Sequence, residues 1–342
     1  MATPGHALRR TAIASSILRN RVVSAIRAHP AHTILACRCS GISCTPPTSY
    51  SLSQTRHSSW SSPTTGLNEK ARKKVTIQTL LNLYKKGEPI TMLTAHDFPS
   101  AHVADVSGMD MVLVGDSLGM VALGLETTTE VVMDEMILHC RSVARGAKAA
   151  FLVGDLPMGS YEVSAEQAVE SALRLVKEGR VHGVKIEGGE ELAPTIKRIS
   201  QAGVPVVGHV GLTPQRQNAL GGFRVQGKTA ASAVKLLRDA LAMQEAGAFM
   251  LVLEAVPAEV ATIITRKLRI PTIGIGAGNG CSGQVLVQVD MSGNYQPGRS
   301  VPKFVKQYAD SRVFPSVEYT YPISKDELAG FQKTVDEVFQ ET

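Results

Sequence analysis

The stretch Val184-Lys185-Ile186-Glu187-Gly188-Gly189 combines the apolar and charged residues from which the fold can be inferred. Successive side chains of a β-strand point to opposite faces, so Val184 and Ile186 share an apolar face while Lys185 and Glu187 share the other. A cation and a carboxylate are costly to bury without partners or a metal. The two glycines end the strand and let another group approach its backbone closely. The stretch therefore predicts a buried strand with charges at its carboxyl end; a purely structural Lys–Glu pair is the alternative.

Seven further apolar runs have the length of strands, and helical patterns separate them. The eight predicted strands cover residues 90–95, 111–115, 150–154, 183–187, 204–209, 249–253, 272–275 and 285–289. Two capping pairs, Thr127 with Glu130 and Ser164 with Gln167, mark predicted helix starts. Strands that alternate with helices form a parallel sheet, and eight such units in roughly 250 residues predict an α/β fold, a (β/α)8 TIM barrel. A doubly wound open sheet is the alternative.

One additional helix is predicted on each side of this barrel. Residues 76–86 form an amphipathic pattern that Gly87 closes, and this helix precedes the first strand. Ser324 begins a last helix, with Glu327 completing a capping box. We therefore predict a single barrel domain over residues 69–342 with a C-terminal helical extension.

Residues 1–68 differ in composition from the rest of the chain. They contain seven arginines, no lysine and no acidic residue, since the first acidic residue is Glu69. Arg- and Ser-rich segments that lack acids are typical of mitochondrial transit peptides. We therefore predict a disordered transit peptide over residues 1–68 and a location in the mitochondrial matrix. A plain disordered tail is the alternative.

The charge balance limits the predicted partners. From residue 69 onward the remaining 29 of the 36 basic residues face all 30 acidic ones, so this part of the chain is nearly neutral. Nucleic-acid binding needs a clustered basic face, and we therefore expect no nucleic-acid partner. No run of 18 apolar residues occurs, so no transmembrane helix is predicted. Only Cys140 and Cys281 lie in this part, a usage that fits a reducing compartment.

Ionisable side chains occur at the ends of five consecutive predicted strands. They are Asp116, Asp155, Glu187, His209 and Glu254, with Lys185 one step inside. The carboxyl ends of barrel strands meet at the catalytic face. Three converging carboxylates would repel one another, so a hard divalent cation is predicted, and all-oxygen ligands favour Mg²⁺. A helix N-cap is the alternative for any one of these carboxylates taken alone.

Six segments, in the same order along the chain, resemble the ketopantoate hydroxymethyltransferase family of the phosphoenolpyruvate/pyruvate barrel superfamily. They are residues 110–120 (DMVLVGDSLGM), 154–157 (GDLP), 184–190, 208–215 (GHVGLTPQ), 252–257 and 273–279 (IGIGAGN). The resemblance extends from about Val75 to the region of Phe304. It implies a Mg²⁺-dependent transfer of a hydroxymethyl group from 5,10-methylenetetrahydrofolate to 3-methyl-2-oxobutanoate. The product is ketopantoate, a precursor of pantothenate and coenzyme A.

The resemblance also implies residue roles and an assembly. Asp116 and Asp155 match the direct metal ligands, and Glu187 matches a third acidic position at the metal. Ser117, Asp155, Lys185 and His209 match substrate-binding positions, and Glu254 matches the base that removes the proton from C3. For His209 a buried structural role is the alternative. The family further implies a ring-based, decamer-like homo-oligomer.

Two places differ from the family pattern or stay open. After the first strand the family often has Thr-Ala-Tyr-Asp, whereas this chain has Thr94-Ala95-His96-Asp97. The glycine-rich residues 274–278 are compatible with phosphate binding, with close approach to the folate, or with simple loop geometry, because a G-x-G pattern alone is weak.

The sequence is compatible with two alternative functions. One is a Mg²⁺-dependent 2-oxo-acid lyase or mutase of the same superfamily. Such lyases usually carry a nucleophilic cysteine in a lid, and this chain has no Lys-Lys-Cys-Gly-His-type segment. The other is a barrel that serves only as an interaction scaffold, which has no need of converging acids.

Overall fold

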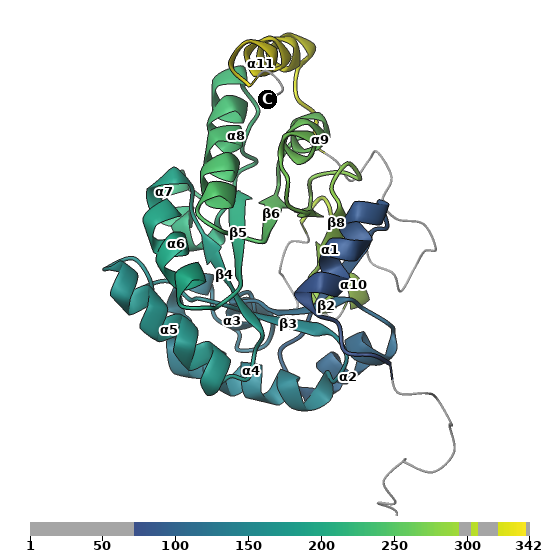
Figure 1. Ribbon diagram of the computed structural model, residues 1–342, viewed down its shortest axis with the longest axis vertical. Helices are drawn as coiled ribbons and strands as arrows, with labels where there is room; N and C mark the ends of the chain where they lie inside the picture. Colours follow the sequence, from purple (N-terminus) through teal and green to yellow (C-terminus); the bar gives the residue numbers. More distant parts are fainter. Residues whose placement is uncertain (1–71, 294–301, 307–320, 340–342) are drawn as a thin grey trace, which may run out of the picture. The chain divides into compact units, whose positions relative to one another are not determined.

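Eight parallel strands close into a barrel in the computed structural model, which describes residues 72–293, 302–306 and 321–339 (Figure 1). The strands are β1 (Ile90–Thr94), β2 (Met111–Val114), β3 (Phe151–Asp155), β4 (Gly183–Glu187), β5 (Val206–Gly211), β6 (Met250–Glu254), β7 (Thr272–Ile275) and β8 (Gly283–Leu286). Each pairs with its neighbours in chain order, and β8 pairs with β1. This closure confirms the (β/α)8 barrel and excludes the open sheet. The predicted transit peptide lies outside the described residues.

Helices surround the barrel and separate the strands from β1 to β7 but, unlike the predicted alternation, none lies in the described residues between β7 and β8 (Figure 1). They are α1 (Ile77–Lys86), α2 (Phe98–Val106), α3 (Leu118–Val121), α4 (Met133–Gly146), α5 (Ala165–Lys177), α6 (Ala193–Gln201), α7 (Gln217–Leu220), α8 (Ala230–Glu245), α9 (Ala258–Lys267), α10 (Gln288–Ser292) and α11 (Lys325–Val338). In the described part of the chain, the 3₁₀ helices η1 (Thr128–Glu130), η2 (Glu190–Leu192) and η3 (Pro214–Arg216) lie in the connections that follow β2, β4 and β5.

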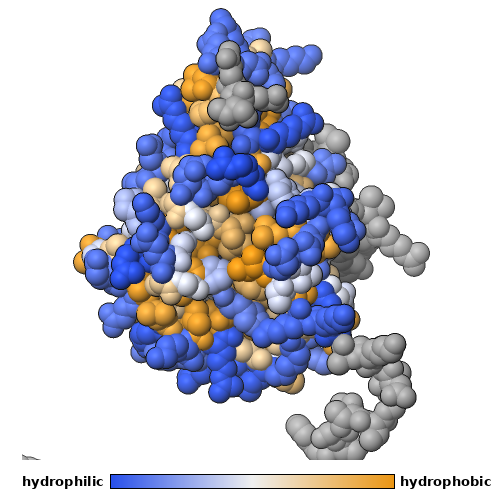
Figure 2. All heavy atoms as spheres, in the orientation of Figure 1, coloured by the Kyte–Doolittle hydropathy of each residue, from blue (hydrophilic) through white to orange (hydrophobic). Residues whose placement is uncertain are grey.

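The core has two layers because strand side chains alternate. On β2, Met111 and Leu113 point into the barrel, while Val112 and Val114 pack against the surrounding helices. Leu80 of α1 is fully buried with the inward-facing residues, so α1 closes one end of the barrel. Hydrophilic residues cover much of the surface, and apolar residues show between them (Figure 2).

Strand β4 follows the same alternation, and this places its charges. Val184 and Ile186 pack outward among the helices, as predicted. Lys185 and Glu187 therefore point into the barrel, at 5% and 1% exposure. The apolar face of the strand thus determines where its two ionisable side chains lie.

Strand β5 lies two residues later than predicted, so His209 lies inside it and does not end it, and β8 and one helix start also differ from the prediction. Strand β8 begins at Gly283 and ends at Leu286, whereas residues 285–289 were predicted. A Cβ at Gly283 would lie 2.2 Å from the Ile90 carbonyl oxygen, so glycine allows the close pairing with β1. Thr127 caps the short η1 rather than a long helix. Helix α4 begins later, where the Glu135 carboxylate accepts the Val132 N–H.

Both additional helices are present. Helix α1 has Thr76 as its N-cap and Gly87, with a φ of 69°, as its C-cap. Helix α11 begins after Ser324, whose side chain accepts the Glu327 N–H, and it buries Phe331 and Val335. No helix among the described residues is long and apolar enough to cross a membrane.

Candidate active site

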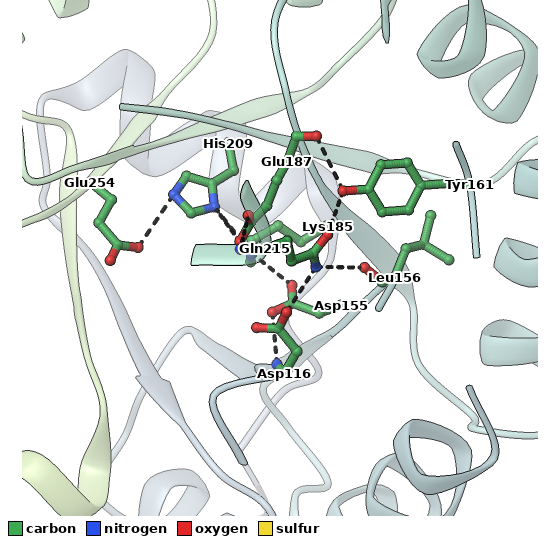
Figure 3. Close-up of polar contacts among 9 residues, drawn as sticks. All are labelled: Asp116, Asp155, Leu156, Tyr161, Lys185, Glu187, His209, Gln215 and Glu254. Carbon is green, nitrogen blue, oxygen red and sulfur yellow. Dashed lines mark hydrogen bonds and ion pairs between the residues drawn. The ribbon is translucent and has the colours of Figure 1, made fainter. Parts of the chain in front are cut away.

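The carboxyl ends of the strands open into a cavity of about 390 Å³, a size usual for small-molecule sites. Every residue predicted for the site lines it: Asp116, Ser117, Asp155, Lys185, Glu187, His209 and Glu254. Asp155, Glu187 and Glu254 are the last residues of their strands, and Asp116 follows β2 by two residues. Figure 3 shows how these side chains, apart from that of Ser117, point toward one another. The barrel therefore brings together residues that are up to 138 positions apart in the chain.

Lys185 lies between two carboxylates. Its Nζ is 3.1 Å from Asp155 Oδ1 and 3.6 Å from Glu187 Oε1. Burial favours the neutral amine, but attraction to Asp155 and Glu187 outweighs it and raises the pKa of Lys185. The site therefore holds a buried ammonium group that stays charged at neutral pH.

His209 connects the lysine cluster to Glu254. Its Nδ1 is 3.3 Å from Glu187 Oε1, and its Nε2 is 3.3 Å from Glu254 Oε2. The same Nδ1 lies 3.2 Å from Lys185 Nζ. Burial and the lysine lower the pKa of His209, but Glu187 and Glu254 prevail and raise it to about 9. The imidazole is therefore protonated at neutral pH and acts as a second cation.

For Asp116 and Asp155, in contrast to Lys185 and His209, the surroundings disfavour the charged form. The Asp116 N–H donates a 3.0 Å hydrogen bond to Asp155 Oδ2, and both side chains are almost fully buried. Burial raises the pKa of Asp116, and repulsion by Asp155 and Glu187 raises it further. Burial also raises the pKa of Asp155, although Lys185 opposes it. Burial acts in the same direction on Glu187, but His209 and Lys185 outweigh it and lower its pKa. A further cation beside the aspartates would relieve their repulsion.

The donor set fits a cation held by two carboxylates. Asp155 Oδ1 is buried without a hydrogen-bond partner and meets Lys185 only as an ion pair. Among residues 72–293, 302–306 and 321–339, no group of three or more His, Cys, Asp or Glu side chains forms a complete metal site. Mg²⁺ usually binds through one or two carboxylates and completes its octahedron with water and substrate oxygens. Asp116 and Asp155 are suited to such a site, and Glu187 lies against Lys185 and His209.

Ser117 lies beside the aspartates. It precedes α3, but its hydroxyl does not cap that helix, and it lines the cavity instead. A Cβ at Gly115 would lie 3.1 Å from Ser117 Oγ and 3.5 Å from Asp155 Oδ2. Glycine at position 115 therefore leaves room for both side chains.

Gln215 and Tyr161, two buried polar residues that contact the site residues, were not predicted. Gln215 is 2% exposed, and its Nε2 donates to Asp116 Oδ2 at 2.8 Å. The Tyr161 hydroxyl donates to Gln215 Oε1. Gln215 ends the quoted GHVGLTPQ segment, so the motif contained it, but a neutral side chain was not among the ionisable residues considered. No local pattern marks Tyr161.

His96 and the glycine-rich residues 274–278, to which no role was assigned from the sequence, each pack against neighbouring side chains. The His96 ring lies 3.7 Å from Asp97 and edge-on to His139. In the glycine-rich loop, Gly276 has a φ of 63°, and a Cβ there would lie 2.6 Å from the Phe304 ring. Loop geometry and packing against Phe304 thus account for this glycine.

Comparisons with known proteins show which family this chain matches. The family model described as ketopantoate hydroxymethyltransferase matches residues 74–316. The 3-methyl-2-oxobutanoate hydroxymethyltransferase of Emericella nidulans is 68% identical, covering 84% of this chain and 86% of its own length. That of Oleidesulfovibrio alaskensis is 51% identical over 73% and 92% of the two chains. The mitochondrial 3-methyl-2-oxobutanoate hydroxymethyltransferase 1 of Arabidopsis thaliana is 49% identical, covering 75% of this chain and 81% of its own length.

Solved structures show the same fold at low sequence identity. A phosphoenolpyruvate phosphomutase from Streptomyces platensis superposes with a TM-score of 0.50 at 15% identity, covering 64% of this chain and 83% of its own. An oxaloacetate acetylhydrolase also has a TM-score of 0.50, at 14% identity over 76% and 95%. The family match spans more than half of the chain, and its relatives are named as one enzyme. This chain therefore belongs to the ketopantoate hydroxymethyltransferase family of enzymes.

Proposed function

We propose that this protein transfers a hydroxymethyl group from 5,10-methylenetetrahydrofolate to 3-methyl-2-oxobutanoate and so makes ketopantoate (2-dehydropantoate) for pantothenate and coenzyme A biosynthesis. The observation that carries the proposal is a division of charge within one cavity. Asp116 and Asp155 gather negative charge at one side, Lys185 and His209 supply buried cations, and Glu254 lies at the other side. The reaction needs these three parts.

The cations and the hydroxyl bind the oxo acid in this proposal. Lys185 Nζ and the Ser117 hydroxyl hold the substrate carboxylate, and His209 and Asp155 orient the rest of the polar end. Attraction in a buried site is stronger than in water because the local dielectric is low. Apolar side chains, among them Leu113, Val252 and Ile275, line the same cavity and suit the isopropyl end.

Asp116 and Asp155 are the proposed direct ligands of Mg²⁺, with Glu187 as the third acidic group near it. When bound, the ion withdraws electrons from the keto oxygen and makes the C3 proton more acidic. The protein's own part is to keep two carboxylates ionised beside each other despite their raised pKa values. Lys185 contributes by balancing the charge of Asp155.

Glu254 is the proposed base that takes the C3 proton. Its side chain is 17% exposed, more than the other carboxylates of the site, and it lines the cavity. His209, which is protonated, holds Glu254 Oε2 from one side and cannot take the proton itself at neutral pH. C3 of the resulting enolate attacks the methylene carbon of the folate as one of its two C–N bonds breaks. Water then displaces the second nitrogen, which leaves the hydroxymethyl group on C3 and releases tetrahydrofolate, whose two nitrogens receive the C3 proton and one proton of the water.

The location and assembly are further proposals. Residues 1–68 direct the chain to the mitochondrial matrix; the name of the Arabidopsis relative, a mitochondrial enzyme, supports this. The family resemblance supports a decamer-like homo-oligomer.

The direct experiment is an assay of the purified protein with 3-methyl-2-oxobutanoate and methylenetetrahydrofolate, with and without Mg²⁺. Ketopantoate should form only when all three are present. A superfamily lyase or mutase would instead consume a dicarboxylate or phosphonate without folate. Cys140 is a poor nucleophile for a lyase, because burial raises the pKa of its thiol.

A further inference from the structure

Gln215 occupies a position at which three strand ends can be linked. It lies in η3, after β5, and its side chain is 2% exposed. Its Nε2 donates to Asp116 Oδ2 at 2.8 Å and to the Leu156 carbonyl at 3.0 Å. Its backbone N–H donates to Glu187 Oε2 at 3.1 Å. One residue thus contacts groups that follow β2 and β3 and the last side chain of β4 (Figure 3).

The orientation of the Gln215 amide follows from its partners. The Leu156 carbonyl can only accept a hydrogen bond, so the NH₂ group must face it and Asp116. The Oε1 then faces the Tyr161 hydroxyl, which donates to it. A flipped amide would bring Oε1 against two acceptors in a buried site and leave both unpaired, which is costly. The Leu156 carbonyl thus sets the orientation that presents a donor to Asp116. The Tyr161 hydroxyl, which has a single proton and also lies 3.3 Å from the Glu187 carbonyl oxygen as a donor, supports this orientation through its contact with Oε1.

A neutral hydrogen-bond donor holds a carboxylate without neutralising its charge, whereas a cationic donor does both. Lys185 holds Asp155 and also neutralises it. The Gln215 amide holds Asp116 in place without cancelling its charge, so the carboxylate remains attractive to a cation. Hydrogen-bonding partners of this kind orient metal ligands, and their loss typically costs about 10–100-fold in metal affinity.

We propose that Gln215 is a positioning residue that fixes the Asp116 carboxylate for a divalent cation, and that Tyr161 fixes the amide of Gln215. The part that concerns a metal rests on the proposed function, which assigns Asp116 as a ligand. Gln215 touches neither the oxo acid nor the reacting atoms in this proposal. It acts through Asp116, with its backbone N–H supporting Glu187.

The test compares the variants Gln215→Met and Gln244→Met. Methionine keeps the length and volume of glutamine but cannot donate a hydrogen bond, and Gln215→Met retains the backbone N–H that holds Glu187. Gln244 is the matched control, because it is 7% exposed on α8 and its amide contacts Glu245 and the Arg269 N–H. Mg²⁺ and Mn²⁺ affinities are measured by calorimetry and by electron paramagnetic resonance, without oxo acid or folate.

Gln215→Met should raise the metal Kd by about 10–100-fold, while Gln244→Met should keep the wild-type Kd. Wild-type affinity in Gln215→Met, or no binding of either metal to the wild-type protein, overturns the proposal. Because this readout needs no substrate, it is separable from the proposed function. A wild-type protein that binds metal but makes no ketopantoate contradicts the function and leaves the inference intact.

Tyr161→Phe provides a milder variant that remains informative if Gln215→Met does not fold. It removes only the hydroxyl and should raise the metal Kd in the same direction but by less. In the double variant with Gln215→Met it should add nothing, because the amide that it orients is gone. Additive effects of the two substitutions, or an unchanged Kd in Tyr161→Phe, would show that Tyr161 does not act through Gln215.

Discussion

Glu254 Oε2, on the proposed base, and His209 Nε2 lie 3.3 Å apart. His209 is already protonated, since the pKa of its imidazole is raised to about 9. We therefore expect Glu254→Gln, which keeps the size of the side chain, to slow the exchange of the C3 hydrogen. The expected loss is about 10²–10⁴-fold, the usual contribution of a general base. Deuterium wash-in to 3-methyl-2-oxobutanoate without folate, followed by NMR, measures it.

Measurements of oxo-acid and Mg²⁺ binding to Glu254→Gln distinguish a base from a residue that only binds or supports the site. Oxo acid and Mg²⁺ should still bind to Glu254→Gln, because neither step requires the proton transfer. Exchange at the wild-type rate would assign the proton to another group. Loss of oxo-acid binding would make Glu254 a binding residue instead of the base.

We expect Asp116, the proposed metal ligand, to lower the stability of the metal-free protein. Burial and repulsion by Asp155 raise its pKa, so its ionised form is unfavourable in the fold. Asp116→Ala should therefore abolish Mg²⁺-dependent binding of the oxo acid without lowering the free energy of unfolding. Calorimetric titration and urea denaturation measure the two quantities. Asp134→Ala on the exposed face of α4 is the control, and wild-type binding in Asp116→Ala would remove this residue from the site.

Among the secondary-structure elements, those with a local pattern were the ones predicted best. The alternation in β4 needs only neighbouring residues, so its outward Val184 and Ile186 and its inward charges could be assigned from sequence. The bounds of β4 and β7 match the prediction, other strand ends moved by up to two residues, and the end of β8 moved by three, because closure of the barrel determines where pairing begins and stops. Gly283 starts β8 since it fits between Ile90 and Ile273, a relation that no local window contains.

In the candidate site, too, contacts between residues far apart in the sequence could not be predicted. The ionisable residues of the site could be named because each lies at or near the carboxyl end of a recognisable strand. Gln215 could not, since its partners Asp116 and Leu156 are 99 and 59 residues away and meet it only in the closed barrel. Tyr161 is 54 residues from Gln215, in the connection after β3, where no periodic pattern indicates which way a side chain points.

His182 joins β3 to the start of β4 through both its backbone and its ring. Its N–H donates to the Leu152 carbonyl, and its Nδ1 accepts the Leu152 N–H, each at 2.9 Å. Burial, with a smaller effect of Lys74, lowers the pKa of His182 to about 4. The folded value lies below the usual 6.5, so the stability contributed by the neutral ring is present above pH 6.5 and is lost as pH falls towards 4.

We therefore expect His182→Asn to reduce the pH dependence of stability between pH 6.5 and 4. The Asn side-chain oxygen can replace Nδ1 as an acceptor, but it does not titrate. Urea denaturation across this range gives the slope of the unfolding free energy against pH. The control is His102→Asn, on an exposed position of α2, which should keep the wild-type slope. An equal slope in His182→Asn and wild type would contradict the role of His182.

At the scale of the whole molecule, the distribution of charge divides the chain into two parts. All 30 acidic residues lie from Glu69 onward, where they balance the basic ones, and the segment before it carries only arginines. The nearly neutral part concentrates its buried charges at one end of the barrel, where Lys185 and His209 meet the carboxylates. The basic segment contributes none of the predicted site residues, so its composition calls for a separate function.

We expect that function to be import: residues 1–68 should carry a fused reporter into mitochondria. Import depends on positive charge and on the absence of acids, which the seven arginines provide. Replacing all seven by glutamine keeps the length and should leave the reporter in the cytosol. Microscopy locates the reporter, and N-terminal sequencing of the mature protein should place the cleavage near Arg56. A wild-type fusion that stays cytosolic, or a mature chain that retains Met1, would show that this segment is not a transit peptide.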